Sequence, residues 1–142
     1  MSRSKLELHD FAEYTFLSQL TYSPDGRLAA FVAQKAKADM EGYAADLYVM
    51  SAAGDDVRRL TSAGDCRGFF WVSETEIAFP AMRDSKDRER AKKGEPLTVY
   101  QKIAVNGGEA QEMLRLPVKV SSAKVMGDGR WAVTAQYGNN IF

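Results

Sequence analysis

The sequence predicts an all-β protein. Short runs rich in β-branched and aromatic residues alternate with turn residues along most of the chain, a pattern typical of strands. No stretch of ten residues after position 20 has an apolar period of 3.6, apart from charged loop material. Segments of similar sequence also recur at a spacing of about 50 residues, which indicates a repeat architecture.

Two turns organise the chain. The first, Ser23-Pro-Asp-Gly26, lies between two apolar runs. Proline sets φ for a turn, aspartate bonds its own backbone, and Gly26 accepts a positive φ without a steric cost. The second turn, Gly54-Asp-Asp56, has the same kind of composition. Each turn therefore predicts a β-hairpin.

Ten strands are expected on these grounds. Residues 1–16 form an N-terminal segment with at most one short helix, for which Asp10 is the expected cap. The strands are expected at residues 17–22, 28–34, 45–51, 57–61, 68–72, 76–81, 98–105, 110–116, 118–125 and 131–136.

The repeat gives the architecture. Residues 52–60 align with residues 105–113, and residues 25–29 align with residues 128–132, about two periods later. Four strands in each period with no helix between them predict antiparallel four-stranded β-propeller blades. We expect blade 1 at residues 17–61, blade 2 at residues 62–116, and the start of a third, truncated blade at residues 117–142, which together make an incomplete propeller.

These repeats resemble a known family. Ser23-Pro-Asp-Gly-Arg27, Leu47-Tyr-Val-Met50 and Arg58-Arg-Leu-Thr61 are similar to the WD40-like repeats of the prolyl oligopeptidase (S9) family of serine peptidases. The charged stretch 83–95 and Asn106-Gly-Gly-Glu-Ala110 resemble the second blade of its acylaminoacyl-peptidase and dipeptidyl-peptidase-like subgroup. Periplasmic propellers of the TolB type share the first of these motifs. The resemblance implies a propeller that gates the access of peptides to a C-terminal α/β-hydrolase domain.

The catalytic residues that the resemblance implies are not expected in this chain. The sequence has no Gly-x-Ser-x-Gly motif, and its one histidine, His9, lies in the N-terminal segment. We expect no catalytic residue here, and the 142 residues alone to be inactive. No cofactor and no metal is expected either, because the sequence has no His/Cys cluster and Asp55-Asp56 is a common turn pair.

The amino-acid composition limits the kinds of partner that are expected for the chain. Nineteen basic residues balance nineteen acidic ones, so no nucleic-acid partner is expected. No apolar run approaches the ~20 residues that span a bilayer, so no membrane partner is expected. The single cysteine, Cys66, fits a reducing compartment and a cytoplasmic location. The alternative to a peptidase propeller is a non-enzymatic interaction module that self-associates through exposed strand edges.

A few features have two interpretations each. The charged stretch 83–95 and the stretch 35–43 are either rim loops over a propeller mouth or ordinary solvated loops, and the second interpretation is favoured for both. Trp71 and Trp131 are expected to pack between blades rather than to bind a ligand. Cys66 is expected to be an incidental thiol rather than a reactive one.

Overall fold

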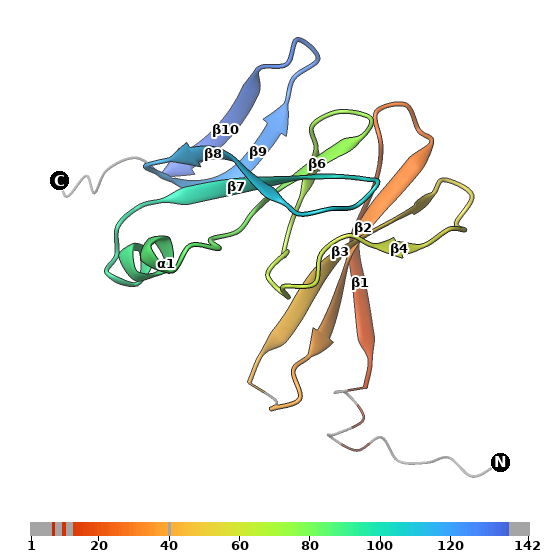
Figure 1. Ribbon diagram of the computed structural model, residues 1–142, viewed down its shortest axis with the longest axis horizontal. Helices are drawn as coiled ribbons and strands as arrows, with labels where there is room; N and C mark the ends of the chain where they lie inside the picture. Colours follow the sequence, from red (N-terminus) through yellow and green to blue (C-terminus); the bar gives the residue numbers. More distant parts are fainter. Residues whose placement is uncertain (1–6, 8–9, 11–12, 40, 137–142) are drawn as a thin grey trace. The chain divides into compact units, whose positions relative to one another are not determined.

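The computed structural model describes residues 7, 10, 13–39 and 41–136, and Figure 1 shows its ribbon. Within these ranges the chain forms three antiparallel sheets and one short helix. It divides into two compact units, Met1–Tyr22 with Gly26–Arg67 and Ser23–Asp25 with Gly68–Phe142. The first unit holds one four-stranded sheet, and the second holds a four-stranded sheet, a two-stranded sheet and the helix.

The first sheet is a simple meander. Its spatial order follows the chain, with β1 (Thr15–Tyr22), β2 (Leu28–Ala36), β3 (Tyr43–Ser51) and β4 (Arg58–Arg59). Side chains alternate between the two faces of a strand, and paired residues share a face. One face carries Val32 opposite Leu47 and Ala30 opposite Val49, and all four residues are buried. This apolar face is the core side of the first sheet.

The second sheet repeats the meander. Its strands are β5 (Phe70–Trp71), β6 (Glu76–Pro80), β7 (Thr98–Ala104) and β8 (Gln111–Leu116), again in chain order. Ile77 pairs with Ile103 and Phe79 pairs with Gln101, and these four residues are all buried. The second sheet therefore has the four-stranded antiparallel form that the repeat predicts.

The third sheet is a hairpin of β9 (Lys119–Val125) and β10 (Trp131–Gln136). The indole of Trp131 meets the rings of Phe70 and Tyr100 edge-on, with centroid distances of 4.9 and 5.4 Å. Aromatic pairs prefer this geometry. Trp131 thus packs the third sheet against the second, which confirms the packing role expected for this tryptophan.

The turns repeat as closely as the strands. Gly54 has a φ of 90°, and its N–H donates to the carbonyl three residues earlier at 2.9 Å. Gly107, 53 residues later, has a φ of 98° and donates in the same way at 3.0 Å. A residue with a side chain is strained at such a φ, so glycine is needed at both turns. The repeat seen in the sequence is therefore a repeat of backbone geometry.

The start of β3 holds the segment that leaves the first sheet. The N–H of Ala45 donates to the carbonyl of Gly64 at 3.1 Å, and the N–H of Cys66 donates to the carbonyl of Ala45 at 2.9 Å. The buried Asp46 carboxylate accepts from the Thr61 hydroxyl at 2.9 Å and from the Gly64 N–H at 3.0 Å. These bonds fix the departing chain beside β3.

The start of β7 holds the segment that leaves the second sheet, as the start of β3 does in the first. Thr98 lies 53 residues after Ala45. Its hydroxyl donates to the carbonyl of Val118 at 2.8 Å and accepts from the N–H of Val120 at 3.0 Å. A side chain here replaces the backbone groups used in the first sheet, but the departing segment is held at the equivalent place.

One prediction about connections was wrong. The stretch 83–95 contains a helix, α1 (Ser85–Lys92), and is not an irregular loop. The stretch 35–43 is the connection expected between two strands, although β2 continues to Ala36 and β3 begins at Tyr43, so that the connection itself is shorter. Most of the short helix expected in residues 1–16 lies outside the described residues, as does His9, whereas β1 already begins at Thr15.

We expect Asp46→Ala to lower the free energy of unfolding by about 2 kcal/mol, because it leaves a buried hydroxyl and a backbone N–H without their acceptor. Urea denaturation followed by circular dichroism measures this change. Glu109→Ala is the control, since Glu109 is exposed in a turn and should change the free energy by less than about 0.5 kcal/mol. Equal effects of the two substitutions would contradict this role of Asp46.

Candidate functional site: the α1 groove

The helix α1 forms because its ends are capped. The Asp84 carboxylate accepts from the N–H of Lys86 at 2.8 Å, which satisfies a free donor of the first turn. At the other end Gly94 has a φ of 86° and donates to the carbonyl of Ala91 at 3.0 Å, while the Glu95 N–H donates to the carbonyl of Arg90 at 3.1 Å. This pattern is a Schellman C-cap.

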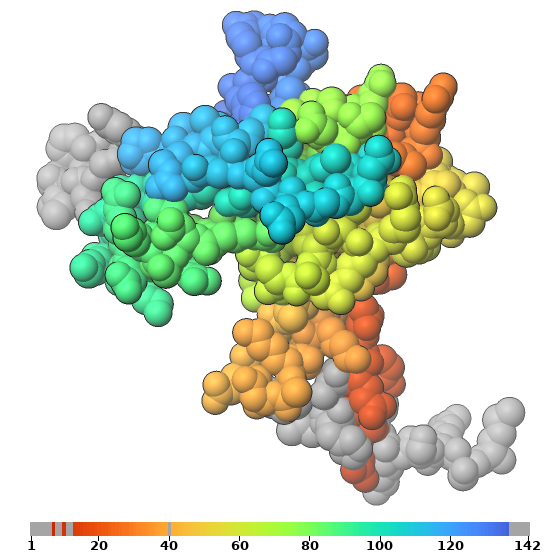
Figure 2. Space-filling view, viewed as in Figure 1, coloured from red at the N-terminus to blue at the C-terminus, as the bar shows by residue number. Residues whose placement is uncertain are grey.

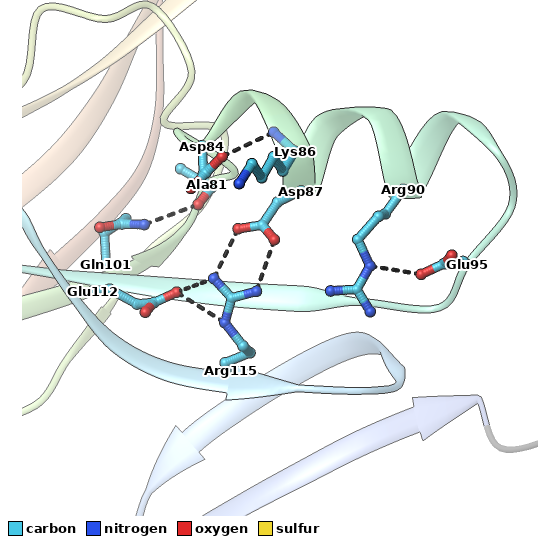
Figure 3. Close-up of polar contacts among 9 residues, drawn as sticks. All are labelled: Ala81, Asp84, Lys86, Asp87, Arg90, Glu95, Gln101, Glu112 and Arg115. Carbon is cyan, nitrogen blue, oxygen red and sulfur yellow. Dashed lines mark hydrogen bonds and ion pairs between the residues drawn. The ribbon is translucent and has the colours of Figure 1, made fainter.

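The helix is tied to the second sheet by one ion pair. Figure 3 shows Asp87 pointing from α1 towards Arg115 on β8. The two terminal guanidinium nitrogens of Arg115, Nη1 and Nη2, donate to the two Asp87 carboxylate oxygens at 2.7 and 2.8 Å. Glu112 accepts from the same guanidinium at 2.6 Å and holds it from the other side. Bidentate pairs of this kind fix geometry as well as charge.

This ion pair determines where the helix lies, because α1 has no apolar face. Ala91 is the one apolar residue among Ser85–Lys92, and Asp87 is the one buried residue of the helix. A surface helix is normally held by an apolar stripe that faces the core. Here a buried carboxylate replaces that stripe.

A groove runs beside the C-terminal end of α1. It encloses about 640 Å³. Its apolar wall consists of Met82, Pro96, Leu97, Pro117 and Val118, and Glu95, Lys119 and Gln136 supply polar groups. Figure 2 shows the green surface of the helix beside the blue surface of later residues of the same unit.

The groove is mainly apolar, and the described residues that line it include one carboxylate, Glu95, and one amine, Lys119. Apolar walls with a few polar groups at the edge are typical of sites for short peptides and small ligands.

Electrostatics support the ion pair. Hydrogen bonding from the Arg115 guanidinium, with a smaller contribution from the Arg115 and Arg90 charges, lowers the pKa of Asp87, although burial acts in the opposite direction. The native state thus favours the ionised carboxylate. Burial raises the pKa of the Tyr100 hydroxyl, next to Trp131.

The other residues singled out from the sequence do not gather at this groove. Cys66 and Trp71 are buried. Asp55 pairs with the Ser51 hydroxyl and Asp56 lies 3.9 Å from Arg58, so both belong to the turn. Within the described ranges no three His, Cys, Asp or Glu side chains lie close enough together to hold a metal ion. No helix in that part of the chain is long and apolar enough to cross a membrane.

We expect Asp87→Ala to increase tryptic cleavage within residues 83–95 several-fold, because α1 loses its tie to β8. Because Asp87 also lies in the first turn of α1, where its charge favours the helix, Arg115→Ala is made as well; it leaves the helix sequence unchanged and should increase cleavage in the same way. Mass spectrometry of timed digests measures the rate of cleavage within residues 83–95. Glu89→Ala, on the same helix but outside the ion pair, should leave the rate unchanged, and equal acceleration by Asp87→Ala and Glu89→Ala would contradict the tie.

Acid should release the same helix. The pKa of Asp87 is lower in the folded state than its ordinary value of about 3.9, so the stabilisation is complete above about pH 4 and is lost as the pH falls through the lower folded value. Hydrogen exchange of residues 85–92, corrected for the intrinsic rate, should be constant from pH 7 to about 4 and then rise. In Asp87→Ala this step should be missing.

Comparison with known proteins identifies the fold. No protein-family model matches the chain, and no curated protein sequence matches it significantly. Among solved structures, the β-propeller domain of the Trilobed protease from Pyrococcus furiosus matches with a TM-score of 0.59 and 17% identity. The match covers 87% of this chain and 34% of that one.

Two acylaminoacyl peptidase structures match as well. The enzyme from Pyrococcus horikoshii has a TM-score of 0.64 and 15% identity, over 93% of this chain and 20% of that one. An acylaminoacyl peptidase in complex with Z-Gly-Gly-Phe-chloromethyl ketone has a TM-score of 0.64 and 16% identity, over 94% and 20%. This chain therefore spans about a third or less of the proteins that it resembles. Its fold is that of a β-propeller, with two four-stranded blades and a two-stranded hairpin in the described residues.

Proposed function

We propose that this chain supplies the first blades of a propeller that gates the entry of peptides to the active site of a cytoplasmic serine peptidase of the prolyl oligopeptidase family. The catalytic partner is a C-terminal α/β-hydrolase domain outside these residues. The observation that supports the proposal most is the match of almost the whole chain to propellers of proteases and peptidases. The peptide chloromethyl ketone bound to one of those peptidases supports peptides as the substrate class.

In this proposal the gate consists of helix α1 and the groove beside it. The helix occupies the connection between the second and third strands of its sheet, outside the sheet itself. With Asp87 paired to Arg115, the helix is a fixed wall that narrows access, and the apolar side of the groove contacts an unfolded segment. Selection by such a rim depends on peptide size, because it needs no particular side chain in the substrate.

The mass of the native gene product tests the first part of this proposal. An antibody against this segment should detect a polypeptide of roughly 70 kDa, the size of seven blades and a hydrolase domain. A band near 15.7 kDa, the mass of the 142 residues, would contradict it. The purified chain itself should not hydrolyse acyl-peptides or aminoacyl esters.

Selection of peptides by size at α1 is tested in the full-length native gene product. We expect Asp87→Ala to raise kcat/KM for peptides longer than about ten residues several-fold and to leave that for dipeptide substrates unchanged, because a released helix widens only the entrance. Glu89→Ala is the matched control. An equal change for long and short peptides would show that α1 does not select by size.

A second candidate is an interaction module without catalytic activity that assembles through exposed strand edges. All eight residues of β1 are exposed, and this strand has one neighbour, β2. An edge strand of this kind can pair with another chain. The bulge between Ser18 and Thr21, with Gln19 at a φ of 60°, interrupts the edge and shortens the length available for pairing.

A further inference from the structure

The carboxylates of the stretch 83–95 are mostly engaged within the structure. This stretch has six basic and four acidic residues, so its sequence alone shows only a modest excess of positive charge. The Asp84 carboxylate caps α1, and the Asp87 carboxylate binds the guanidinium on β8. The Glu95 carboxylate accepts from Arg90 at 2.7 Å (Figure 3). Three of the four carboxylates are therefore used to fix the helix and its C-terminal turn.

Three amines, in contrast, lie at the α1 groove without a partner. Lys119 is one of the residues that line the groove. Lys92 and Lys93 stand in the chain between Ala91 and Gly94, which line it as well. All three amines are on exposed residues, and none of them has an ion pair within the described part of the chain.

The remaining carboxylate of the stretch does not balance these amines. Glu89 lies three residues before Lys92 and four before Lys93, the two spacings at which side chains meet on a helix surface. It can offset one of these two cations and not both. With Lys119 included, three amines face one unpaired carboxylate, so the border of the groove is positively charged.

An apolar groove with a positive border fits a peptide that is both apolar and acidic. The wall formed by Met82, Leu97 and Val118 accepts an apolar side chain. The enclosed volume of about 640 Å³ lies in the range of about 300–1,000 Å³ usual for sites that bind small ligands. A nucleic acid fits less well, because it carries a charge on every nucleotide and is bound along rows of cations, not in a mainly apolar groove.

We propose that the α1 groove binds acidic peptide segments. An apolar side chain of the peptide lies against the groove wall, and carboxylates on either side of it pair with Lys119 and with Lys92 or Lys93. The inference names the class of peptide that the groove selects, and it rests on the gating proposal for the role of this peptide as a substrate. Binding itself is a property of these 142 residues and is measured on them.

Three fluorescein-labelled octapeptides test the class of ligand by fluorescence anisotropy with the 142-residue chain. The acidic probe consists of leucine and glutamate, the second probe has glutamine in place of each glutamate, and the third has serine in place of each leucine. The acidic probe should bind at least about fivefold more tightly than either of the others, because only it uses both the wall and the amines. Raising the NaCl concentration from about 0.05 to about 0.5 M should remove most of its advantage over the glutamine probe.

Two matched pairs of variants test the position of the site. Lys119→Gln should weaken binding of the acidic probe about three- to fivefold, whereas Lys124→Gln, on the same strand β9 but outside the groove, should change it by less than about 1.5-fold. Lys92→Gln at the C-terminal end of α1 and Lys86→Gln at its N-terminal end should differ in the same way. All four substitutions remove one positive charge, and glutamine favours helix about as well as lysine does. Circular dichroism verifies that the variants fold.

Three results would overturn the inference: no binding of the acidic probe at a chain concentration of about 1 mM, equal binding of the glutamine probe, or equal effects of Lys119→Gln and Lys124→Gln. A single-stranded oligonucleotide of the same net charge that bound more tightly than the acidic probe would also overturn it, and would indicate a phosphate site. None of these results bears on the mass of the native gene product or on the peptide-length test. A gene product near 15.7 kDa would contradict gating and leave the measured binding unchanged, so the two proposals fail separately.

Discussion

The hydrogen bonds at the start of each third strand are the constraint on which the rest of the structure depends. After the last strand of a four-stranded meander the chain leaves the sheet, and it does so along a defined path. Asp46 and the Ala45 backbone define this path in the first sheet, and the Thr98 hydroxyl defines it in the second. Because these groups are buried or partly buried, losing one leaves a polar atom that water reaches poorly.

The repeat was visible in the sequence because the residues that recur have strong local preferences for turn or strand conformation. Turn glycines such as Gly54 and Gly107 recur because only glycine adopts their φ without strain. Strands such as β3 and β7 were evident because they are bounded by turns and rich in β-branched and aromatic residues. Local chemistry was therefore sufficient to predict the ten strands to within a few residues.

The helix α1 could not be predicted from apolar periodicity, because it has none. What holds it is Arg115, 28 residues after Asp87 in the chain, and no local pattern reports a contact over that separation. The sequence did contain weaker signs: Asp84 at the cap position, Asp87 in the first turn, and Arg90 and Lys92 in the last. The groove was missed for a related reason, since Pro96 and Pro117 come together only once β7 and β8 have paired.

The connection between the second and third strands takes a very different form in the two blades. In the first sheet only residues 37–42 separate β2 from β3, and the Lys37 N–H donates to the Gly42 carbonyl across the gap at 3.0 Å. In the second sheet the same connection spans residues 81–97 and contains the helix α1 (Figure 1). This helix is capped at both ends and forms one wall of the groove. The paired strands are alike in both cases. Mutation can therefore lengthen, shorten or recharge this connection without altering the residues that make the sheet, and new specificity can evolve at that end of a blade while its stability is conserved.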